Sequence, residues 1–101
     1  MYETHNLKKL PILGAKASEA WQGYLAFDKA ALADGAIPKK YKELIAIGVA
    51  LATQCPYCID IHVNEARKAG ASDEELAEAG FVAAALRAGA AVTHATHLMK
   101  D

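Results

Sequence analysis

The sequence has 101 residues, 53% of them hydrophobic, and its charged residues nearly balance to a formal net charge of −1. This length suits one domain rather than two. The balanced charge excludes a strong non-specific nucleic-acid binder and any general attraction to anionic membranes. Alanine supplies 23 residues and aromatic side chains only 7. Because such small side chains bury little large apolar surface, we expect self-association to supply the missing burial.

The hydrophobic pattern predicts the cellular compartment, and the compartment in turn bears on the role of the two cysteines. No stretch approaches eighteen uncharged apolar residues, so no membrane span is predicted. The N-terminus carries Lys8 and Lys9 but no apolar signal segment, which predicts a cytoplasmic protein. In that reducing compartment the close pair Cys55 and Cys58 indicates a redox-active or metal-binding site rather than a structural disulfide.

Period-two alternation is nowhere sustained, so the fold is predicted to be all-α. Residues 1–14 are expected to be irregular and to end at Gly14. Ser18 is a candidate N-cap for a helix running to about Asp34, and Gly35 then supplies a C-terminal stop.

Four further helical segments are expected, over residues 38–53, about 55–69, 73–88 and 90–99. Pro38 suits the first turn of its helix because a proline there loses no hydrogen bond. Ser72 followed three residues later by Glu75 is a capping-box pattern. Gly89 is expected to break or kink the last helical stretch.

The segment Cys55-Pro56-Tyr57-Cys58, followed by His62, carries the chemistry. A helix advances about 100° per residue, so Cys58 lies about 60° and His62 about 20° from Cys55, on one face. Cys58 and His62 are also an i,i+4 pair. Two thiols and an imidazole therefore converge near a helix N-terminus, where orphan N–H groups and the helix dipole favour a thiolate.

Glu43 lies twelve positions before Cys55, in the preceding helix. If these two helices form an antiparallel hairpin around Gln54, Glu43 lies roughly level with His62. Its apolar neighbours make a partly buried carboxylate plausible. A carboxylate, an imidazole and a thiol in a row form a proton relay.

These residues resemble the alkylhydroperoxidase D-like branch of the carboxymuconolactone decarboxylase family. The resemblance covers about residues 38–95 of the single domain 1–101, and its signature is a glutamate, twelve residues, C-x-x-C and a histidine four further on. It implies that Cys58 attacks a peroxide, that Cys55 resolves the sulfenic acid to a disulfide, and that Glu43 and His62 relay protons. Tyr57 stands where some members carry a second histidine. The decarboxylases that name the family generally lack the cysteine pair, so lactone decarboxylation is not expected.

Other interpretations of the same residues stay open. The cysteines alone are compatible with two small buried apolar side chains. A zinc site from Cys55, Cys58 and His62 needs a fourth ligand, and His94 and His97 lie on the distant C-terminal segment. Thioredoxin-like chemistry shares the C-x-x-C motif but requires strands, and none is predicted.

The leading hypothesis is a cytoplasmic thiol peroxidase, with an antioxidant role, that reduces hydrogen peroxide or a small organic hydroperoxide. The resemblance implies a dithiol, a lipoyl-type group or a partner protein as reductant, with no haem, flavin or metal cofactor. The alternatives are a disulfide reductase or thiol-transfer adaptor of a peroxiredoxin system and a non-enzymatic redox sensor. Relatives of this size are typically hexamers built as trimers of dimers, so a homo-hexamer is expected, with a two-fold dimer as the alternative.

Overall fold

The computed structural model describes residues 2–101, and every regular element in that part of the chain is helical. The all-α prediction is therefore confirmed. The elements follow one another as η1 (Thr4–Lys9), α1 (Leu10–Lys16), α2 (Ser18–Leu32), α3 (Lys39–Thr53), α4 (Pro56–Lys68), α5 (Asp73–His94) and η2 (Ala95–Leu98).

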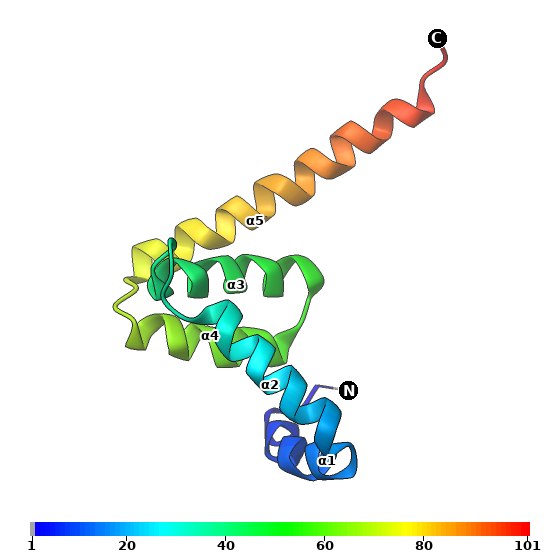
Figure 1. The fold of residues 1–101 in the computed structure, drawn as a ribbon. Coiled ribbons are helices and arrows are strands. Elements are labelled where there is room, and N and C mark those ends of the chain that lie inside the picture. The colour runs from blue at the N-terminus through cyan, green and yellow to red at the C-terminus, as the bar shows by residue number, and fades with distance from the viewer. Residues whose placement is uncertain (1) are drawn as a thin grey trace.

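Helices α3 and α4 form the hairpin at the centre of the molecule (Figure 1). Gln54 ends α3 in the left-handed conformation, with φ of 56°, and its N–H returns to the last turn of that helix. The chain then reverses directly into α4. Ile47, Ala66 and Ala71 form the buried core, and partly buried leucines and a valine pack against them. This is the antiparallel hairpin around Gln54 that was expected to bring Glu43 level with His62.

The capping box at the start of α5 is confirmed. The Glu75 N–H donates to Ser72 Oγ at 3.1 Å, and the Ser72 N–H donates to Glu75 Oε1 at 2.9 Å. The capping box thereby satisfies two N–H donors that lack a partner within the helix.

Several expectations about helix boundaries are wrong. Ser18 does not cap α2: the N-cap residue is Ala17, without a side-chain hydrogen bond, because the Ala17 carbonyl already accepts the Trp21 N–H at 2.9 Å and the helix starts one residue early.

Residues 4–16 are not irregular but form η1 and α1, because Pro11 fits the first turn of a helix. Gly89 does not break α5, which continues to His94. A helical glycine costs only about 1 kcal/mol relative to alanine, and the alanines around Gly89 outweigh that cost.

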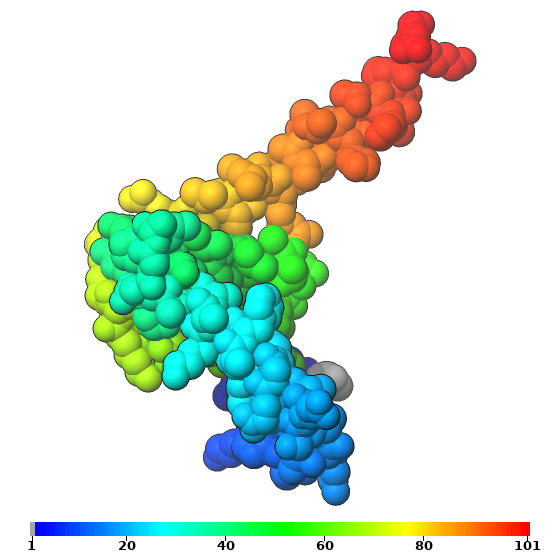
Figure 2. All heavy atoms as spheres, in the orientation of Figure 1, coloured from blue at the N-terminus to red at the C-terminus, as the bar shows by residue number. Residues whose placement is uncertain are grey.

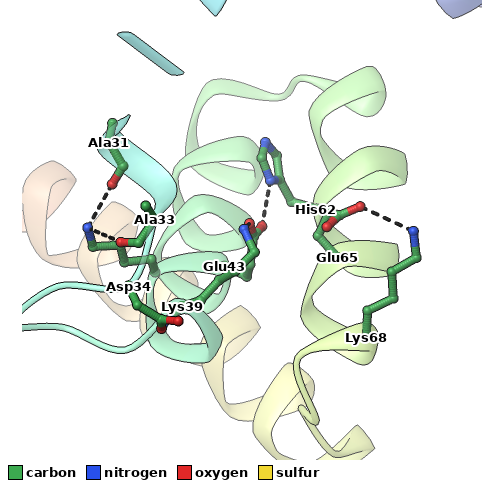
Figure 3. Close-up of polar contacts among 9 residues, drawn as sticks. Ala31, Ala33, Asp34, Lys39, Glu43, His62, Glu65 and Lys68 are labelled. Atoms are coloured by element: carbon green, nitrogen blue, oxygen red, sulfur yellow. Dashed lines mark hydrogen bonds and ion pairs between the residues drawn. The ribbon is translucent and has the colours of Figure 1, made fainter. Parts of the chain in front are cut away.

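The end of α2 also differs in its cause. The helix stops at Leu32, before Gly35, and Lys42 from α3 accounts for its terminal carbonyls. The Lys42 ammonium donates to the carbonyls of Ala31 at 2.9 Å and Ala33 at 2.7 Å. Figure 3 marks these two hydrogen bonds by dashed lines at the labelled alanines. The stop is therefore fixed by a contact between helices rather than by glycine.

Helix α5 leaves the hairpin and projects as an arm with no other part of the described chain against its far half (Figures 1 and 2). The radius of gyration is 16.9 Å, against about 13 Å for a compact chain of this length. Large apolar side chains such as Phe81, Leu86 and Val92 are each about 70% exposed or more. The protomer leaves an apolar surface uncovered.

By length and composition alone, the stretch Asp73–Leu98 is apolar enough to cross a membrane, although none of its most apolar window is buried. Arg87 interrupts this stretch, and a charge at the centre of a bilayer is costly. The Arg87 guanidinium donates to the Ala52 carbonyl at the end of α3. The stretch is thus tied to the hairpin as well as exposed.

Candidate active site

The two cysteines lie at the start of α4 and are joined by a disulfide, with their Cα atoms 5.3 Å apart. Cys55 is the N-cap residue, and its Sγ accepts the backbone N–H of Cys58 at 3.3 Å. Pro56 occupies the first turn of α4, where a proline loses no hydrogen bond. Both sulfurs therefore lie at the positive end of the helix dipole, where a thiolate is favoured.

Glu43 and His62 are in direct contact across the hairpin. The Glu43 side chain is only 1% exposed, and its Oε2 lies 2.7 Å from His62 Nδ1 (Figure 3). A carboxylate oxygen only accepts, so Nδ1 carries the proton of this bond. In Figure 3 the other ring nitrogen points away from Glu43, toward the end of the hairpin where α3 is joined to α4 and the cysteines lie.

The structure thus brings the four predicted residues together as two bonded pairs on one hairpin. The two pairs are neighbours along α4, because Cys58 and His62 are one turn apart on that helix. Burial of Glu43 confirms the expectation that this carboxylate is not a solvated surface group.

Glu43 has a second partner, Lys39, which was not predicted from the sequence. The Lys39 ammonium lies 3.1 Å from Glu43 Oε1, and the lysine side chain is 39% exposed. Lys39 precedes Glu43 by four residues, so the ordinary i,i+4 spacing of helical ion pairs was a signal available in the sequence.

A cleft of about 550 Å³ opens beside this carboxylate, between the end of α2 and the hairpin. Its walls combine apolar side chains with several charged ones; the lining residues are Asp28, Lys29, Leu32, Ala33, Asp34, Lys39, Glu43, Ile61, His62 and Glu65. A small molecule in this cleft would lie next to the imidazole.

The N-terminal segment lies against Tyr57, one of the two residues between the cysteines, a contact that was not predicted from the sequence. The Tyr57 hydroxyl accepts the backbone N–H of Glu3 at 3.2 Å and the Asn6 side-chain N–H at 3.0 Å. The ring of Tyr2 packs edge-on against Tyr57, with centroids 4.6 Å apart. Tyr57 therefore connects the redox motif to η1.

The zinc alternative gains no fourth ligand from the structure. Within residues 2–101 no group of three or more histidine, cysteine, aspartate or glutamate side chains is arranged to hold a metal ion. His94 and His97 pack edge to face with centroids 5.2 Å apart, at the far end of α5 and η2. His5 lies beside Glu3 in the N-terminal segment, with 3.1 Å between His5 Nδ1 and Glu3 Oε2.

Comparison with known proteins decides the family. The sequence matches the carboxymuconolactone decarboxylase family over residues 18–101. The chain belongs to this family. The family resemblance seen in the motif is therefore confirmed, and the match also takes in α2, which contributes one wall of the cleft.

Two solved structures have the same fold. A carboxymuconolactone decarboxylase family protein from Legionella pneumophila, in its apo form, is 35% identical, with a TM-score of 0.79 over 92% of this chain and 84% of that one. A protein from Methanobacterium thermoautotrophicum is 32% identical, with a TM-score of 0.81 over 85% of this chain and 97% of that one.

Two sequence relatives add bacterial context. The protein called uncharacterized protein 4 in cox locus, from Paracoccus denitrificans, is 51% identical over 82 residues, which is 81% of this chain and 71% of the relative. A Cupriavidus necator protein is 40% identical over 62 residues, 61% of this chain. The chain spans about half the length of that second relative.

Proposed function

We propose that this family member is a thiol-dependent peroxidase that uses Cys58 and Cys55 to reduce hydrogen peroxide or a small organic hydroperoxide. The observation that carries the proposal is the bonded Glu43 and His62 pair, one turn from a disulfide-forming C-x-x-C at a helix N-terminus. Catalysis by a cysteine pair requires a base for the attacking thiol and a second thiol within bonding reach. In this proposal His62 is the base and Cys55 is the second thiol.

The first step forms a sulfenic acid. His62 Nε2 takes the proton of the Cys58 thiol, and the thiolate attacks one peroxide oxygen while the O–O bond breaks. His62 then gives this proton to the alkoxide or hydroxide, which leaves as an alcohol or as water. Cys58 ends as Cys–SOH, so the sulfur is oxidised by two electrons and the peroxide is reduced by two.

The second step closes the disulfide. Cys55 attacks the Cys58 sulfur, an S–S bond replaces the S–O bond, and the hydroxyl leaves as water with the remaining thiol proton. The N-cap position of Cys55 favours its thiolate. An external dithiol, by family analogy a lipoyl-type group or a partner protein, then reduces the disulfide by thiol–disulfide exchange. Both cysteines become thiols again, and the external dithiol becomes a disulfide. No haem, flavin or metal enters the cycle.

The test is steady-state peroxide consumption by the wild type with a panel of small dithiols and a lipoylated protein. Cys58→Ser is expected to abolish turnover, and Cys55→Ser to stop it after one sulfenic acid per chain. Mass spectrometry of the oxidised wild type should show one intramolecular disulfide. Separately over-oxidised thiols in the wild type would contradict the proposal.

The same assay separates the alternative functions. A disulfide reductase or thiol-transfer adaptor would consume peroxide only when a peroxiredoxin is added. A redox sensor would be oxidised once and would not turn over with any reductant.

We further propose that the protein acts in the cytoplasm as a homo-hexamer. Support for assembly comes from the projecting α5 and from the groove of about 690 Å³ between α3 and α5, whose lining includes Leu44, Ile45, Val49, Val82 and Leu86. An exposed apolar patch of this kind indicates an interface between proteins. The number of subunits rests on the family analogy.

A further inference from the structure

We infer that Lys39 is a positioning residue of the active site: its permanent charge balances buried Glu43, so that His62 stays neutral with Nε2 unprotonated. This inference rests on the proposed function, in which Nε2 accepts the thiol proton. Lys39 acts through Glu43 and has no contact with the reacting sulfur in this scheme.

The contacts divide the carboxylate between two partners. Oε1 of Glu43 receives the Lys39 ammonium at 3.1 Å, and Oε2 receives His62 Nδ1 at 2.7 Å. With 1% of the Glu43 side chain exposed, water contributes little to its solvation. Its negative charge must therefore be balanced by these neighbours, since an unpaired buried charge is strongly unfavourable.

Only one of the two partners carries its charge permanently at neutral pH. A lysine ammonium is positive there, whereas an imidazole becomes positive only by taking a second proton. Because Lys39 already balances Glu43, His62 can keep Nδ1–H directed at Oε2 and leave Nε2 as an acceptor. If Lys39 lost its charge, a proton on Nε2 would become the nearest replacement.

The position of Lys39 is itself fixed by the chain. It is the first residue of α3, and its backbone N–H donates to Asp34 Oδ1 at 2.6 Å. Figure 3 shows its side chain running along α3 to Glu43, on the side of the carboxylate away from His62. The loop before α3 thus places the ammonium one helical turn from the carboxylate.

The other charged groups around the cleft do not substitute for Lys39. Asp28, Lys29 and Asp34 line it from α2 and the following loop, and Glu65 lines it from α4. Within residues 2–101 no ion pair joins these four to Glu43 or His62, and Glu65 instead meets Lys68 at 3.4 Å. The local charge balance of Glu43 therefore depends on Lys39.

The experiment is nitrogen-15 NMR of histidine-labelled protein in its native assembly at neutral pH, with the Cys55–Cys58 disulfide closed so that no thiol proton can reach His62. Chemical shifts distinguish protonated from unprotonated ring nitrogens, and loss of signals in His62→Gln assigns the resonances. Lys39→Met removes the charge at nearly constant volume. Lys40→Met is the matched control, because Lys40 is on the same turn and pairs instead with Glu75 at 2.9 Å.

We expect Nε2 of His62 to be unprotonated in the wild type and in Lys40→Met, and protonated in Lys39→Met. Peroxide turnover should fall about 10-fold or more in Lys39→Met, as partial loss of a general base requires, and Lys39→Arg should restore both readouts. If Lys39→Met does not fold, Lys39→Gln tests the same charge with a hydrated side chain.

An unprotonated Nε2 in folded Lys39→Met or Lys39→Gln, or a protonated Nε2 in the wild type, would overturn the inference. The NMR readout needs no substrate, so it stands apart from the proposed activity. Absence of peroxide turnover in the wild type would refute the proposed peroxidase activity. The NMR spectra would still decide whether Lys39 keeps Nε2 of His62 unprotonated.

Discussion

Replacing Glu43 by glutamine tests the proton relay with little change in volume. The wild-type carboxylate accepts on both oxygens, one from Lys39 and one from His62. An amide has one accepting oxygen and one donating NH₂ group, so it cannot satisfy both partners. Either the NH₂ faces the Lys39 ammonium, donor against donor, or it faces His62 Nδ1.

The second orientation is the one that removes the base. An NH₂ group at Nδ1 requires an unprotonated Nδ1, which moves the ring proton to Nε2 and leaves no acceptor for the thiol. Loss of a general base costs about 10²–10⁴ in rate, or about 2.7–5.5 kcal/mol in activation free energy. We expect Glu43→Gln to lower peroxide turnover within this range.

The fold should survive the substitution. One mismatched buried polar contact costs about 1–3 kcal/mol, against a typical total stability of about 5–15 kcal/mol. The unfolding transition should therefore shift to lower temperature and stay cooperative, which circular dichroism can follow. A loss of rate at retained structure is then attributable to the relay.

The control is Glu65→Gln, which neutralises a second carboxylate lining the same cleft. Glu65 is 37% exposed and pairs with Lys68 at the surface, so its loss should leave turnover unchanged. Steady-state rates with one dithiol and one peroxide compare the two variants directly. If Glu43→Gln kept more than about a tenth of the wild-type rate, or if Glu65→Gln lost as much, the relay would be refuted.

Three further predictions concern the fold, the pH dependence of stability and the assembly. Gly14→Ala should lower the melting temperature, because its Cβ would lie 2.4–2.6 Å from indole atoms of Trp21, and such overpacking costs about 1–3 kcal/mol. Gly23→Ala, with open space around it, should instead stabilise α2 by about 0.5–1 kcal/mol. Equal effects of the two substitutions on the melting temperature would contradict the packing of Gly14 against Trp21. The Lys40 ammonium holds the pKa of the Glu75 carboxyl below its ordinary value, so the ion pair stabilises the fold above that ordinary value and loses its effect as pH falls through the lowered pKa. Thermal melts of Glu75→Gln should differ from the wild type at neutral pH and converge in acid, and a constant difference would count against the pair. Light scattering should give about six times the 10.7 kDa chain mass; a dimer mass would remove the family analogy for subunit number, and a monomer at micromolar concentration would contradict assembly.

The sequence by itself determined the parts of the protein that depend on local physics. Helical periodicity and the absence of alternation gave an all-α chain, and the Ser72 and Glu75 pattern placed the start of α5. The same periodicity placed Cys58 and His62 on one face of α4, with Cys55 directly before its first residue. Their side-chain types and spacing within one helix are enough for this conclusion.

Only the tertiary structure decided which side chains meet across helices. It buried Glu43 against His62 and gave Lys39 the second carboxylate oxygen, a contact whose i,i+4 spacing alone does not distinguish it from a surface ion pair. It also laid the N-terminal segment against Tyr57.

The ends of the helices show the same division. Gly35 and Gly89 resemble stops in the sequence, yet α2 ends through a contact from Lys42, and α5 continues past Gly89 to His94. Residue propensities of about 1 kcal/mol are small enough for helix context and tertiary contacts to override. Propensity therefore determined that helices form, and packing determined where they end and what their side chains do.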